Sequence, residues 1–227
     1  MPENEDVWVV IPVFNEERVI ADVVADVRTT FPNVVCVDDG SRDGSAERVA
    51  ATRAHLVRHP VNMGQGAALQ TGLSYALARS GGKYFVTFDA DGQHQVEDAR
   101  RMVEIARQGG ADVVLGSRFL DQPRKVPAVK RLVLRAVVAL SPNTRRLRLT
   151  DAHNGLRVLT RPAAERLRIT MNGMAHASEI VSQLAKARVP VVEVPVTILY
   201  TEYSMSKGQS LINGVNILFD LSVRQRG

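Results

Sequence analysis

The chain has 227 residues, of which 45% are hydrophobic and 23% charged, and its formal net charge is +5. These values are ordinary for a folded protein with a real core, in one large domain or two small ones. A single cysteine, Cys36, excludes an intramolecular disulfide. The sequence has no run of about 18 uncharged apolar residues, so we predict no membrane-spanning helix.

Short apolar runs alternate with amphipathic stretches along the first half of the chain. The runs predict strands at residues 7–13, 34–37, 56–57, 83–88 and 112–115. Helical spacing predicts helices from Asn15 towards Phe31 and at 46–53, 67–78 and 96–108. This alternation is typical of an α/β domain with a mostly parallel sheet flanked by helices.

Two carboxylates one residue apart, Asp89 and Asp91, follow the predicted strand that ends at Phe88. They can converge only if the strand stops there and the backbone turns, which Gly92 permits. Hard oxygen ligands of this kind suit Mg²⁺ or Mn²⁺ bridged to substrate phosphates. The alternative is a polar turn that closes a buried strand, and the motif alone does not decide between the two.

Other acidic residues favour the metal-diphosphate interpretation. Ligands of parallel sheets bind outside the carboxyl ends of the strands. Glu16, Asp39 and Asp91 all follow predicted strands, so we expect them to face one crevice although they are far apart in the sequence.

The alternation ends after Arg118, and a basic segment follows. It contains eight basic residues and no acidic one, more than the whole net surplus of +5: Arg124, Lys125, Lys130, Arg131, Arg135, Arg145, Arg146 and Arg148. Residues 129–140 are mostly apolar, which predicts an amphipathic helix in a membrane interface or, alternatively, a core helix with a solvated rim. No aromatic residue lies here to stack on bases, so we expect no nucleic-acid partner.

The last third of the chain predicts a strand at 156–159, helices from Pro162 and at 176–187, and an edge strand at 189–200 interrupted by two prolines. The apolar tail, residues 211–223, predicts a helix that packs on its own domain or on a partner surface. His94, His153 and His176 are more simply structural histidines than ligands.

Six motifs in fixed order resemble glycosyltransferase family 2, inverting enzymes with the GT-A fold. They are residues 10–16 (VIPVFNE), 37–41 (VDDGS), 62–66 (NMGQG), 89–94 (DADGQH), 116–118 (GSR) and 151–155 (DAHNG). Within the family the chain looks most like dolichol-phosphate mannose synthases and bacterial polyprenyl-phosphate relatives. Its ending, residues 200–216, looks closest to actinobacterial enzymes proposed to load N-acetylgalactosamine onto polyprenyl phosphate.

The resemblance implies one domain over 1–227, with a nucleotide-sugar half (1–118) and an acceptor half (119–227) that carries the interface helix and a C-terminal helix. It also implies the following site residues. The nucleotide sugar would contact Pro12, Phe14, Glu16, Asp39, Asp89, Ala90, Asp91 and Lys207, the last beside Ser206 in a closing loop. Mg²⁺ or Mn²⁺ would be held by Asp89, Asp91 and Gln93, the acceptor phosphate by Arg118 and Arg131, and Asp151 would act with Asp91 in catalysis.

The implied reaction moves a sugar from a nucleotide-diphosphate sugar to a polyprenyl phosphate. N-acetylgalactosamine from UDP, mannose from GDP and glucose all stay open, because Thr201, Glu202 and Tyr203 stand where relatives carry arginines. A phosphate acceptor with a second pKa of about 6 needs no strong base. The alternatives are a soluble family 2 enzyme acting on a saccharide hydroxyl, or a nucleotide-sugar-binding subunit without turnover.

The acidic N-terminus, residues 1–6, is unlike a secretory leader. We therefore expect a cytoplasmic protein at the inner face of the cell membrane, with a small integral-membrane partner protein docked on its tail.

Overall fold

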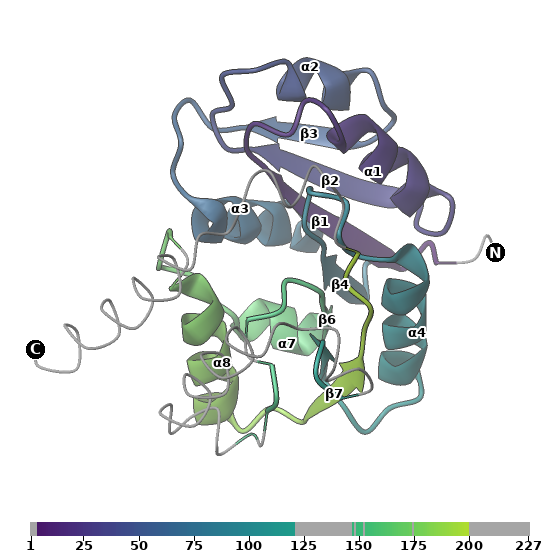
Figure 1. Cartoon of the computed structure of the whole chain (residues 1–227). Coiled ribbons are helices and arrows are strands. Elements are labelled where there is room, and N and C mark those ends of the chain that lie inside the picture. The colour runs from purple at the N-terminus through teal and green to yellow at the C-terminus, as the bar shows by residue number, and fades with distance from the viewer. Residues whose placement is uncertain (1–3, 121–146, 148, 152, 174, 200–227) are drawn as a thin grey trace, which may run out of the picture.

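A seven-stranded sheet with helices on both faces forms the body of the molecule (Figure 1). The computed structural model describes residues 4–120, 147, 149–151, 153–173 and 175–199. Arg131, Ser206, Lys207, the interface helix and the C-terminal helix therefore lie outside the described residues.

The strands appear in the sheet in the order β3-β2-β1-β4-β6-β5-β7. Their bounds are β1 Val7–Val13, β2 Asn33–Asp38, β3 His55–Arg58, β4 Tyr84–Thr87, β5 Val113–Ser117, β6 Arg157–Thr160 and β7 Val191–Pro195. The helices are α1 Ile20–Arg28, α2 Ser45–Ala50, α3 Gln65–Leu77, α4 Val96–Arg107, α7 Arg161–Arg166 and α8 His176–Ala187. The predicted α/β class and mostly parallel sheet are confirmed.

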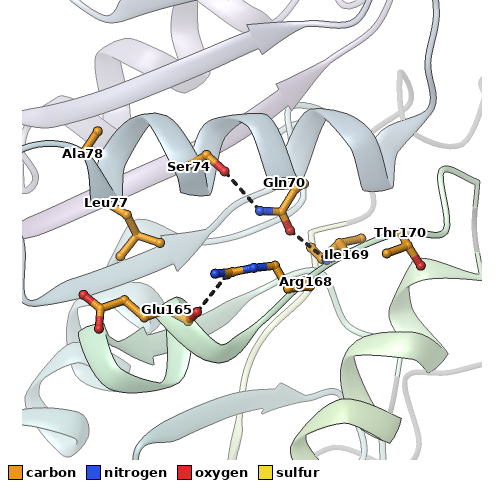
Figure 2. Close-up of a pocket in the computed structure, with 8 residues that line it drawn as sticks. All are labelled: Gln70, Ser74, Leu77, Ala78, Glu165, Arg168, Ile169 and Thr170. Carbon is orange, nitrogen blue, oxygen red and sulfur yellow. Dashed lines mark hydrogen bonds between the residues drawn. The ribbon is translucent and has the colours of Figure 1, made fainter.

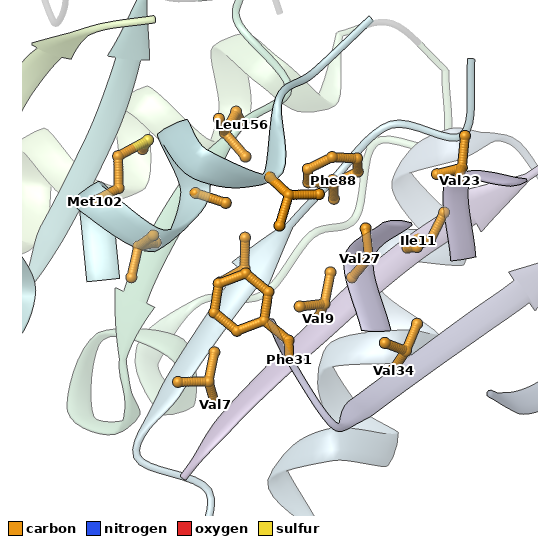
Figure 3. Close-up of a cluster of buried hydrophobic side chains, with 14 of the residues drawn as sticks. Val7, Val9, Ile11, Val23, Val27, Phe31, Val34, Phe88, Met102 and Leu156 are labelled. Carbon is orange, nitrogen blue, oxygen red and sulfur yellow. The ribbon is translucent and has the colours of Figure 1, made fainter. Parts of the chain in front are cut away.

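Both faces of the central strands are buried, which explains why β1 is apolar without alternation. Val7, Val9 and Ile11 point to the face covered by α1 and α4, where Phe31 and Met102 fill the same cluster (Figure 3). Trp8 and Val10 point to the other face, covered by α3, α7 and α8.

Strand β6 is the one strand of the described sheet that runs against its neighbours. It lies between β4 and β5 and is antiparallel to both. Its first residues therefore sit at the edge where the other strands have their carboxyl ends. The loop before β6, which carries Asp151, thus reaches the same edge as Asp89 and Arg118.

Two predicted elements differ from the structure. Helix α1 begins at Ile20, not after Asn15, because Asn15 has a left-handed φ of 55°. Its main-chain N–H donates to Ser41 Oγ, and its Oδ1 accepts from the Arg42 N–H, so Asn15 ties two loops together. The edge position of β7 is confirmed, but its ladder ends at Pro195, five residues earlier than predicted.

Candidate active site

A cleft of about 370 Å³ opens at the carboxyl edge of the sheet. Its lining residues come from the ends of β1, β2 and β4, from the start of α3 and from Gly173: Pro12, Val13, Phe14, Glu16, Asp39, Asn62, Gly64, Gln65, Ala68, Asp89, Ala90, Asp91 and Gly173. All of the predicted nucleotide-sugar residues that the structure describes are among them. The predicted convergence of Glu16, Asp39 and Asp91 is confirmed.

A larger groove of about 660 Å³ lies along α3, away from this cleft (Figure 2). Its polar groups are largely tied to the protein: Gln70 accepts from the Ile169 N–H and donates to Ser74, and Arg168 donates to the Glu165 carbonyl. The groove carries no pair of facing carboxylates, so the smaller cleft is the candidate active site.

Asp39 shapes one wall of the cleft. Its carboxylate is 2% exposed and accepts hydrogen bonds from the main-chain N–H groups of Met63 (2.9 Å) and Gly64 (2.7 Å). His59 Nδ1 lies 2.7 Å from the same carboxylate, and His59 Nε2 lies 2.9 Å from Thr71 Oγ1 on α3. Asp39 thus fixes the loop before α3, and its direct contact with a nucleotide stays a prediction.

The backbone of Gly64 passes very close to a neighbouring loop. Its φ is 96°, and a Cβ at this position would lie 2.3 Å from the Asn172 carbonyl oxygen. Only glycine suits both constraints. Gly64 therefore lets the loop before α3 pack against the loop at Asn172 beside the cleft.

The Asp89 carboxylate is held from two sides. Gln65 Nε2 donates to its Oδ1 (3.2 Å), and His94 Nε2 lies 3.0 Å from its Oδ2. Burial raises the pKa of Asp89, but the hydrogen bond from His94 and the positive charge of Arg157 bring it below its ordinary value. Asp89 is therefore ionised at neutral pH and held in a fixed orientation, and its role as a metal ligand stays a prediction.

Asp91 has the opposite character. Burial and the neighbouring charge of Asp89 raise the pKa of Asp91 to about 6. Its Oδ1 accepts from the Gln93 main-chain N–H at 3.1 Å. Two carboxylates that disfavour each other's ionisation form a site in which a cation relieves the repulsion.

The donor set fits a hard divalent ion that is also bound by its substrate. Among the described residues no group of three or more His, Cys, Asp or Glu could hold a metal on its own. Two carboxylates, Asp89 and Asp91, completed by phosphate oxygens are the arrangement that Mg²⁺ usually accepts. The Gln93 carbonyl accepts from the Leu199 N–H, and the role of its side chain as third ligand stays a prediction.

Arg118, predicted to bind the acceptor phosphate, and Asp151, predicted to act in catalysis, are paired with each other. Arg118 Nε and Nη2 donate to the two Asp151 carboxylate oxygens at 2.6 and 2.8 Å, and the Arg118 main-chain N–H donates to one of them at 3.1 Å. Burial raises the pKa of Asp151, but the Arg118 guanidinium outweighs it and keeps the pKa below its ordinary value. Asp151 is thus suited to orienting a cationic group and not to taking up a proton.

Glu193 of β7 supports this pair from behind. Its carboxylate accepts from the main-chain N–H groups of Thr150 (2.7 Å) and Asp151 (2.9 Å) and from Thr150 Oγ1 (2.9 Å). Because Glu193 also lies on the edge strand next to β5, it holds the Asp151 loop beside the end of β5, which Arg118 directly follows.

The model of the family described as "Glycosyl transferase family 2" matches residues 8–168. The chain belongs to this family. It is therefore a glycosyltransferase, as the motifs predicted.

Two relatives and one solved structure show how far the similarity extends. The chain is 27% identical to a UDP-N-acetylglucosamine–dolichyl-phosphate N-acetylglucosaminyltransferase of Methanococcus voltae, over 97% of this chain and 96% of the relative. It is 30% identical to an undecaprenyl-phosphate mannosyltransferase of Micrococcus luteus, over 91% of each chain. Glucosyl-3-phosphoglycerate synthase from Mycobacterium tuberculosis, solved with UDP, shares the fold with a TM-score of 0.74 at 18% identity, over 93% of this chain and 77% of that one.

Several residues around the glycosyltransferase site were not assigned a role from the sequence. Arg157, the first residue of β6, is buried beside Asp89 and Asp151, and His176 at the start of α8 is buried near it. Burial lowers the pKa of His153 to about 4, and Ser178 Oγ lies 3.3 Å from its Nε2. The signal for Arg157 was its place directly after the polar turn at Gly155, but only the antiparallel pairing of β6 brings it to the site.

A membrane-spanning helix is not found among the described residues. In the ranges that the structure describes, every helix is too short or too polar to cross a bilayer.

Proposed function

We propose that this glycosyltransferase transfers a sugar from a nucleotide-diphosphate sugar to a polyprenyl phosphate. The observation that carries the proposal is the similarity, over nearly the whole length of both chains, to two enzymes named for dolichyl-phosphate and undecaprenyl-phosphate acceptors. The cleft adds chemical support, because Asp89 and Asp91 line it at the carboxyl edge of the sheet, where ligands of parallel sheets bind.

In this proposal the donor occupies the cleft at Asp89 and Asp91. Phe14, which is 42% exposed at the cleft wall, offers an aromatic face to the nucleotide base. A divalent ion held by the two carboxylates would stabilise the negative charge that develops on the leaving diphosphate. Asp89 keeps its charge and orientation through Gln65 and His94.

The acceptor phosphate would approach from the side of Arg118. Its second pKa is about 6, so it is already largely ionised at neutral pH and needs no general base. The lowered pKa of Asp151 agrees with this, because an acid held in its ionised form by Arg118 orients the guanidinium and accepts no proton. Guanidinium groups suit this task because they bind phosphate oxygens in pairs.

The decisive experiment measures transfer from a panel of nucleotide sugars to a short polyprenyl phosphate, with Mn²⁺, with Mg²⁺ and with chelator. UDP-N-acetylglucosamine, UDP-N-acetylgalactosamine, UDP-glucose and GDP-mannose form the panel. We expect metal-dependent formation of one lipid-phosphate sugar. Transfer to a saccharide hydroxyl but not to the lipid phosphate would favour the soluble alternative, and nucleotide binding without any transfer would refute the proposed reaction.

We also propose that the protein works at a membrane surface. The support is the acceptor class together with the basic residues between Arg124 and Arg148. Co-sedimentation with vesicles of neutral or anionic lipid tests this, and we expect binding to anionic vesicles that weakens with salt. Truncation before Leu211 tests whether a partner protein docks on the tail, because membrane association unchanged in cells would count against it.

A further inference from the structure

Arg157 lies at the junction between the donor and acceptor sides of the site. It is the first residue of β6, paired with Thr87 of β4 on one side and Leu115 of β5 on the other. Thr87 comes two residues before Asp89, and Leu115 comes three residues before Arg118. The reversed strand thus places one arginine between the two chain segments that carry the predicted metal ligands and the predicted acceptor residues.

The guanidinium of Arg157 is buried without a close partner among the described residues. The residue is 3% exposed, no hydrogen bond from its side chain to a described residue is found, and no described carboxylate lies within ion-pair distance. A buried charge left without compensation is strongly unfavourable. The compensation comes through space, because Asp89 and Asp151 are the two anions that act on Arg157.

The two buried histidines nearby do not add to the positive charge of Arg157. His153 and His176 both lie near Arg157, and burial lowers the pKa of both imidazoles, that of His153 to about 4, which favours their neutral forms. The Arg118 guanidinium is engaged by the Asp151 carboxylate through two hydrogen bonds. Within the part of the chain that the structure describes, Arg157 is therefore a positive charge that forms no direct ion pair with a carboxylate, unlike Arg118.

We propose that Arg157 is a positioning residue for the transfer reaction. Its buried positive charge stabilises the ionised carboxylates of Asp89 and Asp151, and it reduces the electrostatic repulsion when the acceptor phosphate enters beside the diphosphate. This inference rests on the proposed function, because only an anionic acceptor requires the extra positive charge. It assigns no contact to Arg157 with either substrate. The residue acts through the two carboxylates and through its field, which extends over several ångströms in a buried site.

This role predicts two effects of opposite sign when the charge is removed. In Arg157→Met the site becomes more negative, so the KM for a short polyprenyl phosphate should rise by about tenfold or more, as loss of one buried charge implies. Mn²⁺ should bind at least as tightly as in the unmodified protein, because a repelling cation has gone. If Arg157 were only a filler that keeps Asp89 in place, its loss would weaken Mn²⁺ binding instead.

Arg157→Lys is the rescue variant. Arginine and lysine differ in the paired hydrogen bonds of the guanidinium, which no described residue accepts from Arg157, and in pKa, because a buried lysine loses its proton more readily. The acceptor KM of Arg157→Lys should therefore stay within about threefold of the unmodified enzyme at a pH low enough to keep the lysine protonated, and rise relative to that enzyme at higher pH. Arg161→Met is the matched control: Arg161 donates to the carbonyls of Gly82, Leu77 and Arg79, remote from the cleft, so its loss should lower the melting temperature and leave the acceptor KM unchanged.

The experiment uses the full chain and three measurements: acceptor KM and kcat, Mn²⁺ affinity from the electron paramagnetic resonance signal of free Mn²⁺, and thermal melting. A raised acceptor KM in Arg157→Met with undiminished Mn²⁺ affinity, rescued by lysine, supports the proposal. An unchanged acceptor KM, or weaker Mn²⁺ binding, overturns it. If Arg157→Met does not fold, Arg157→Lys decides through the pH dependence of its acceptor KM relative to the unmodified enzyme. A rise that appears only at higher pH, as the lysine loses its proton, supports the proposal, and the same large rise at every pH overturns it.

Failure of the proposed function is recognised separately. It appears as absence of transfer to polyprenyl phosphate by the unmodified enzyme, whereas failure of this inference appears only among the variants of an enzyme that does turn over.

Discussion

Gly155 lies against the Asp89 carboxylate so closely that a single methyl group should disable the donor site. A Cβ at Gly155 would lie 2.1 Å from Asp89 Oδ2 and 2.6 Å from its Cγ. A retreat of the Gly155 backbone would disturb the hydrogen bond that Thr87 Oγ1 donates to its carbonyl at 2.6 Å. Asp89 must therefore move by about 1 Å or more to restore a normal contact distance.

That displacement would stretch the hydrogen bonds that Asp89 receives from Gln65 and His94, now 3.2 and 3.0 Å, beyond useful length. A shift of about 1 Å in a catalytic group can cost about 100-fold in rate, which corresponds to about 2.7 kcal/mol of activation free energy. We expect Gly155→Ala to lower metal-dependent transfer by this factor. The φ of Gly155 is outside the left-handed region, so alanine adds no backbone strain there.

The assay measures kcat and thermal melting of Gly155→Ala and of a control variant that should lose stability and keep its activity. Gly110, in the turn before β5, has a φ of 86°, and a methyl group added there would meet nothing within 4 Å. Gly110→Ala should therefore lose about 1 kcal/mol of stability and keep full activity. If Gly155→Ala retains normal kcat, or loses activity only in proportion to lost stability, the reasoning about Asp89 is refuted.

Three further predictions concern the same edge of the sheet. Asp91→Ala should abolish transfer and leave the fold intact, and normal turnover in a metal-dependent assay would reject Asp91 as a ligand. Because the pKa of Asp91 is raised to about 6, the folded state binds the extra proton between about pH 4 and pH 6. The metal-free protein should thus lose stability as pH rises through that window, and Asp91→Asn should remove this slope in thermal melts, whereas an unchanged slope would contradict the assignment. Glu193→Gln should destabilise the fold by about 1–3 kcal/mol and reduce kcat, measured by denaturant unfolding and transfer assays, because Glu193 holds the Asp151 loop through three hydrogen bonds.

The residues that line the cleft could be predicted to lie together because their signals are local. The apolar run before Asp89 predicts a buried strand, and the acidic pair with Gly92 predicts a turn at its end. Alternating strands and helices then place Glu16, Asp39 and Asp91 at one edge by a general rule of parallel sheets. The cleft contains all three.

The sequence did not reveal the contacts that Asn15 and Asp39 make with distant loops. Asn15 is a good helix cap by residue type, yet here it adopts a left-handed conformation and bonds to the loop at Ser41 and Arg42. Asp39 lines the cleft, and its oxygens are also engaged by the loop at Met63 and Gly64, which the sequence did not predict, while its contact with a nucleotide stays a prediction. These partners lie more than 20 residues away, so no local pattern announces them.

The sequence by itself determined the α/β class, the glycosyltransferase family and the carboxylates that line the cleft, because periodicity, turn residues and ordered motifs are properties of short segments. Only the tertiary structure decided what surrounds those carboxylates. The antiparallel insertion of β6 brings Arg157 and Gly155 to Asp89, and the same insertion pairs Asp151 with Arg118. Strand order arises from contacts between distant segments, and these long-range contacts set the electrostatics of the site.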